Sequence, residues 1–148
     1  MGTWGATAFE DDTAMEFYDE YCSSEQSIKQ LESCFDIVLE RQYNMDDLLM
    51  EGFDEPINAL VSAEIIASSI GKPVSTFPDK EYHYDMETPE IDLSKLRVQV
   101  NIDLKDKAKR ALIKIVKAND IHLTTLWLES ESFDEWERYI NDLVARLQ

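Results

Sequence analysis

The chain has 148 residues, of which 44% are hydrophobic and 10% aromatic, enough apolar material for the core of one domain, and we expect a single helical domain over residues 1–148. A formal net charge of −17 argues against nucleic acid and anionic membranes as partners, because both would repel this surface. The sequence contains no run of 18 apolar residues and no basic N-terminal leader, so we expect neither a membrane span nor a secretory signal. The two cysteines do not form a CxxC pair, and we expect free thiols and a cytoplasmic location.

The N-terminal residues predict an arm followed by a helix. Two glycines with Trp4 and Phe9 indicate an irregular segment over residues 1–10 that is held down by its aromatic rings. A helix is expected from Asp12, with Asp11 or Asp12 as the N-cap and acidic side chains near its positive end.

A second helix is predicted from Ser23 or Ser24 to about Tyr43. Ser23 and Gln26 have the spacing of a capping box, and apolar residues follow at helical intervals. The acidic segment 44–55 then leads to the next helix, and its spacing does not fit a calcium-binding EF-hand loop.

The central element is a helix over residues 55–70. Pro56 suits its first turn and Gly71 the residue after its end, while apolar residues occupy most of its circumference, as in a helix covered by others. Glu64 is the one charge in its middle, so that carboxylate must be paired, hydrogen-bonded or protonated. We interpret it as a structural carboxylate, and the alternatives are a catalytic or a metal-binding role.

Residues 74–103 interrupt the helical pattern. After Gly71, the prolines Pro73, Pro78 and Pro89 punctuate a stretch without helical period. Residues 97–102 alternate polar and apolar residues as a strand would, with 74–77 as the pairing candidate. We expect an irregular insertion or a short β-hairpin here. Its aromatic group, Tyr82, His83 and Tyr84, would either dock on the helices or face a partner.

Two further helices are expected near the C-terminus. The first runs from about Leu104 to Ala118 and carries a stripe of lysines, which we expect to pair with the acidic helices of the same chain. A short element is expected at 125–129. The last helix opens with a capping box of Ser132 and Glu135 and buries Trp136. The predicted fold is therefore all-α, a compact bundle of five or six helices around the central helix.

Familiar catalytic motifs are absent from the sequence, including GxSxG, HExxH, glycine-rich phosphate loops and GxGxxG. The histidines His83 and His122 are isolated, and ExxH pairs of a diiron bundle are missing. We therefore predict a protein that is not an enzyme, with no catalytic residue, cofactor or metal ion. An enzyme or metal protein that uses Glu64 with a histidine is the minority alternative.

The opening MGTWGATAFEDDTAMEF, the central ALVSAEIIASSIGKP and the closing LWLES and WERYINDLVARL resemble a family of small bacterial proteins, domain of unknown function 4259. The resemblance covers both ends and the middle, and leaves residues 74–103 as an insertion. It implies a buried structural cluster of Trp4, Glu64 and Trp136, in which Glu64 accepts hydrogen bonds from the N-terminal segment.

Charge is distributed unevenly along the chain. Residues 1–71 hold 16 acidic and two basic residues, net −14, whereas residues 72–148 hold 15 acidic and 12 basic residues, net −3. An acidic half-chain without catalytic motifs favours an inhibitor that binds a basic toxin domain, such as a nuclease. In general character this is similar to immunity proteins of contact-dependent growth inhibition and other polymorphic toxin systems, and to antitoxins.

The partner-binding candidates of this hypothesis are acidic residues, with aromatic anchors in the insertion. They are Asp11, Asp12, Glu16, Asp19, Glu20, Asp46, Asp47, Glu51, Asp54, Glu55, Tyr82, His83 and Tyr84. The alternative is a non-catalytic housekeeping or adaptor protein whose charge only keeps it in solution, and a homo-oligomer is compatible with either.

Overall fold

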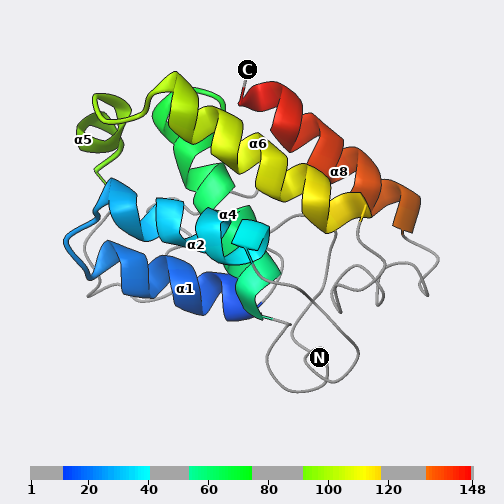
Figure 1. Cartoon of the computed structure of the whole chain (residues 1–148). Helices are drawn as coiled ribbons and strands as arrows, with labels where there is room; N and C mark the ends of the chain where they lie inside the picture. Colours follow the sequence, from blue (N-terminus) through cyan, green and yellow to red (C-terminus); the bar gives the residue numbers. More distant parts are fainter. Residues whose placement is uncertain (1–11, 41–53, 75–91, 118–132, 148) are drawn as a thin grey trace.

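The computed structural model describes residues 12–40, 54–74, 92–117 and 133–147 (Figure 1). Six helices lie in these ranges: α1 (Asp12–Cys22), α2 (Ile28–Glu40), α4 (Asp54–Ser69), α5 (Leu93–Arg97), α6 (Ile102–Lys117) and α8 (Phe133–Arg146). The predicted all-α class is confirmed. The expected elements at 1–10, 44–53 and 125–129 lie outside the described residues.

Helix α4 is the centre of the bundle, as its apolar circumference predicts. It contacts α1, α2, α5, α6 and α8, and from Pro56 to Ser69 only Asn58 is more than slightly exposed. In Figure 1 the other helices are arranged around it, with α6 and α8 on one side. The core therefore consists of α4 together with the apolar faces of its neighbours.

Helix α4 ends as Gly71 predicts. Gly71 has φ +86°, its N–H donates to the Ser68 carbonyl (3.1 Å), and the Lys72 N–H donates to the Ala67 carbonyl (2.9 Å). These two bonds are those of a Schellman motif, which needs a left-handed residue at this position.

The start of α2 differs from its prediction by one turn. Ser27, not Ser23, is the cap: its hydroxyl accepts from the Lys29 N–H (3.1 Å), and the Gln30 side chain accepts from the Ser27 N–H (2.8 Å). The sequence contains two successive Ser-x-x-Gln spacings, so the motif alone could not choose between them.

Gln26, in the turn before α2, instead connects two parts of the chain. It is 8% exposed and has φ +54°; its amide donates to the Cys22 carbonyl (3.1 Å) and accepts from the Asp92 N–H (2.8 Å). It thereby fixes the start of α5 against the end of α1.

The strand predicted at residues 97–102 is wrong, and the described part of the chain contains no β-hairpin. Arg97 ends α5, residues 98–99 form a turn, and Ile102 begins α6. The alternation did not mark a buried strand face, because Val98 and Ile102 are 84% and 76% exposed while Leu96 is buried. The possible pairing partner, 74–77, is described only at Val74, which has no regular structure.

Candidate functional site

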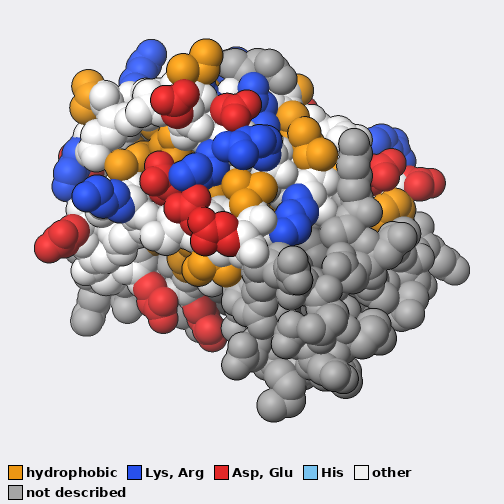
Figure 2. Space-filling view, in the orientation of Figure 1, with side chains coloured by type: hydrophobic (Ala, Val, Ile, Leu, Met, Phe, Trp, Pro, Cys, Tyr) orange, Lys and Arg blue, Asp and Glu red, His pale blue; other side chains and the backbone are white. Residues whose placement is uncertain are grey.

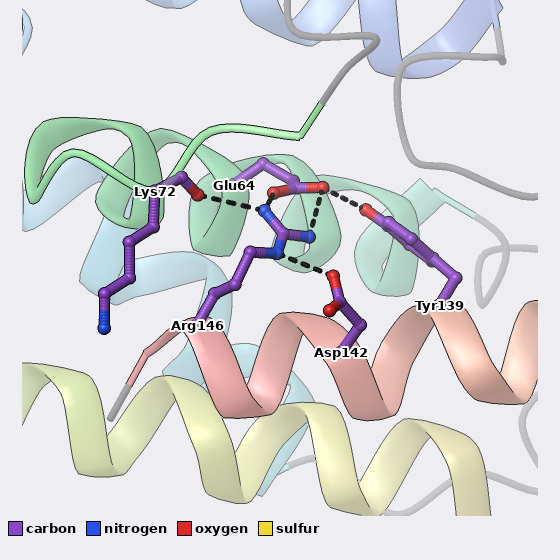
Figure 3. A network of polar contacts seen from close by, with 5 residues as sticks. All are labelled: Glu64, Lys72, Tyr139, Asp142 and Arg146. Atoms are coloured by element: carbon purple, nitrogen blue, oxygen red, sulfur yellow. Dashed lines mark hydrogen bonds and ion pairs between the residues drawn. The ribbon is translucent and has the colours of Figure 1, made fainter.

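The most highly organised polar group of the described residues surrounds Glu64 (Figure 3). Its side chain is 0% exposed, in the middle of α4. One carboxylate oxygen accepts from Arg146 Nη1 at 2.7 Å; the other accepts from the Tyr139 hydroxyl at 2.5 Å and from Arg146 Nη2 at 3.3 Å. The carboxylate is thus held in a two-pronged pair with a guanidinium, the strongest geometry for such a pair.

Arg146 is held in turn by two more acceptors. Its Nε donates to Asp142 at 2.8 Å, and its Nη1 also donates to the Lys72 carbonyl at 3.2 Å. That carbonyl is placed by the Schellman turn after α4. We call Glu64, Lys72, Tyr139, Asp142 and Arg146 the Glu64 network, and it joins the middle and the end of α4 to the last two turns of α8.

Burial and pairing act in opposite directions on the charges of the network. Burial, the largest influence, raises the pKa of the Glu64 carboxyl, against hydrogen bonds from Arg146 and Tyr139 that lower it. Burial lowers the pKa of the Arg146 guanidinium, but Glu64 and Asp142 more than offset this and the pKa is raised. The guanidinium is therefore the fixed charge of the pair, and the carboxyl is the group whose ionisation depends on its partner.

Of the three residues in the predicted structural cluster, the structure describes Glu64 and Trp136. Glu64 is fully buried, and Trp136 is 1% exposed on the same face of α8 as Tyr139, one turn earlier, with its ring 5.9 Å from that of Phe133. Trp4 lies outside the described residues. The described hydrogen bonds of Glu64 come from α8, and the N-terminal segment that the resemblance implies as its partner lies outside the described residues.

Tyr139 and Arg146 were not recognised as partners of Glu64 from the sequence. With Asp142 they recur at spacings of three and four, a polar stripe beside the apolar stripe of α8. That pattern places them together on one helix face. The pattern does not show that Glu64, about 80 positions away, is their partner. That pairing is decided by the packing of α8 against α4.

The acidic partner-binding candidates are described mainly on α1. Glu16 and Glu20 are exposed, one turn apart, and neither forms an ion pair with another described residue. Asp19 is partly buried and its carboxylate oxygens are covered. The remaining candidates lie outside the described residues or, for Asp12, Asp54 and Glu55, have undescribed side chains.

Lysine side chains of α6 pair with acidic side chains of α2, as the lysine stripe predicts. Lys107 Nζ lies 2.9 Å from Asp36 and 3.6 Å from Glu32, and the hydrogen bond to Asp36 raises its pKa. Lys114 Nζ donates to the Val38 carbonyl at 2.6 Å, at the negative end of α2. Figure 2 shows basic side chains over α6 beside acidic ones over α2.

The two cysteines are free thiols, as expected. Burial raises the pKa of Cys22 to about 11, and burial also raises the pKa of Cys34. Neither thiol is activated as a nucleophile would be. Within the described ranges no three His, Cys, Asp or Glu side chains converge as metal ligands, and no described helix is long and apolar enough to cross a membrane.

The fold and the Glu64 network define an all-α protein whose last helix is tied to its central helix by a buried carboxylate and guanidinium. The chain belongs to the family described as Domain of unknown function (DUF4259), which matches residues 2–139. Glu64 and Tyr139 lie in the matched segment, and Asp142 and Arg146 lie beyond its end. Comparisons with curated proteins and with solved structures gave no match.

Proposed function

We propose that this protein is a non-catalytic inhibitor of the immunity or antitoxin kind, which binds a basic toxin domain through the acidic surface of its N-terminal half. The observation that carries the proposal is the net charge of −14 over residues 1–71. A nuclease binds phosphates with a cationic face, and an acidic protein surface complements the same face. Such complementarity accelerates association and disfavours partners of like charge.

Several basic side chains already bind acceptors within the fold, and this supports the proposal. Lys107 and Lys114 bind α2, and Arg146 binds Glu64, so these positive charges are engaged within the fold. The exposed carboxylates Glu16 and Glu20 of α1 have no ion-pair partner among the described residues. Their charge is therefore available to an external cationic surface.

The first test is purification of the tagged protein from its native host at native expression, with elution by a salt gradient and mass spectrometry. We expect one basic partner that elutes only at high salt. Expression of that partner alone should arrest growth, and co-expression with this protein should restore it. Recovery of this protein alone, or a partner that is harmless, would refute the inhibitor hypothesis and favour the housekeeping or adaptor alternative.

The α1 assignment has its own test. Glu16→Gln with Glu20→Gln should slow association with the purified partner about three- to tenfold at low salt, because peripheral charges act mainly on the association rate. The matched control is Asp134→Asn with Glu135→Gln, which removes the same charge from exposed positions on α8. Equal association rates for the two double variants would exclude α1 as the contact.

A further inference from the structure

We draw no further inference here: the strongest candidate, the exposed apolar side chains Val98 and Ile102 at the turn between α5 and α6, carries nothing because nothing in the described part of the structure shows what covers them.

Discussion

Removal of the guanidinium from the Glu64 network is expected to produce a loss of stability that depends on pH. Arg146→Met keeps the apolar stem and removes the charge that lies 2.7 Å from Glu64. Breaking a buried ion pair by removing one partner costs about 3–4 kcal/mol, because the other charge stays buried without compensation. For a chain of this length that corresponds to a decrease in Tm of about 10 °C at neutral pH.

The pH dependence follows from the carboxyl that remains. Burial already raises the pKa of Glu64, and the variant loses the Arg146 interactions that lower it. A carboxyl whose pKa is higher in the folded than in the unfolded state binds its proton more tightly when folded. Its contribution to stability is present below the unfolded value of about 4.3 and is lost as pH rises through the folded pKa. The deficit should therefore be smaller near pH 4.5 than near pH 7.

The assay is urea unfolding followed by circular dichroism at several pH values. The double variant Arg146→Met with Glu64→Gln should lose the pH-dependent part and regain about 1–2 kcal/mol at neutral pH, since it no longer buries an unpaired charge. Arg110→Met is the matched control: it breaks an exposed pair with Asp106 and should cost less than about 0.5 kcal/mol. A deficit independent of pH, or additive effects in the double variant, would refute this reasoning.

Three further substitutions test the elements around the network by urea unfolding. Tyr139→Phe removes the 2.5 Å hydrogen bond to Glu64 and should cost about 1.5–3 kcal/mol; no loss would mean that the hydroxyl is not an effective donor. Gly71→Ala meets no steric contact, so its expected cost of about 1–2 kcal/mol comes from the positive φ alone, and a neutral effect would contradict the Schellman turn. Gln26→Ala should cost about 1–3 kcal/mol and raise amide exchange at Asp92, which unchanged exchange would disprove.

Short-range signals explain why the central helix could be predicted closely. Pro56 and Gly71 act on the few residues beside them, and the apolar circumference of the segment needs no knowledge of its partners. The predicted bounds, 55–70, differ from α4 by one residue at each end. The predicted start of α2 was one turn too early because Ser23 and Ser27 have the same capping chemistry. Gln26 does not complete a capping box with Ser23, and its side chain accepts a hydrogen bond from the N–H of Asp92, in a distant segment.

Helix α5 and the partners of Glu64 could not be predicted, for two different reasons. A helix of five residues has too few turns to display a period, and its stability comes from the burial of Leu96 rather than from its own propensity. For Glu64 the sequence required a partner but did not specify it. The polar stripe on α8 that contains Arg146 predicts which side chains share a helix face, but it does not predict which residue that face contacts.

The arrangement of cations connects the fold to the proposed function. A helical bundle with a net charge of −17 must limit repulsion between its own elements, and α6 does this where its Lys107 meets Asp36 and its Lys114 meets the end of α2. These contacts neutralise α2 and leave Glu16 and Glu20 of α1 without such a counter-charge among the described residues. Neutralising every acidic helix would serve stability equally well. Among the described residues the compensating cations reach α2 and not Glu16 or Glu20 of α1, which is compatible with the proposed external cationic partner.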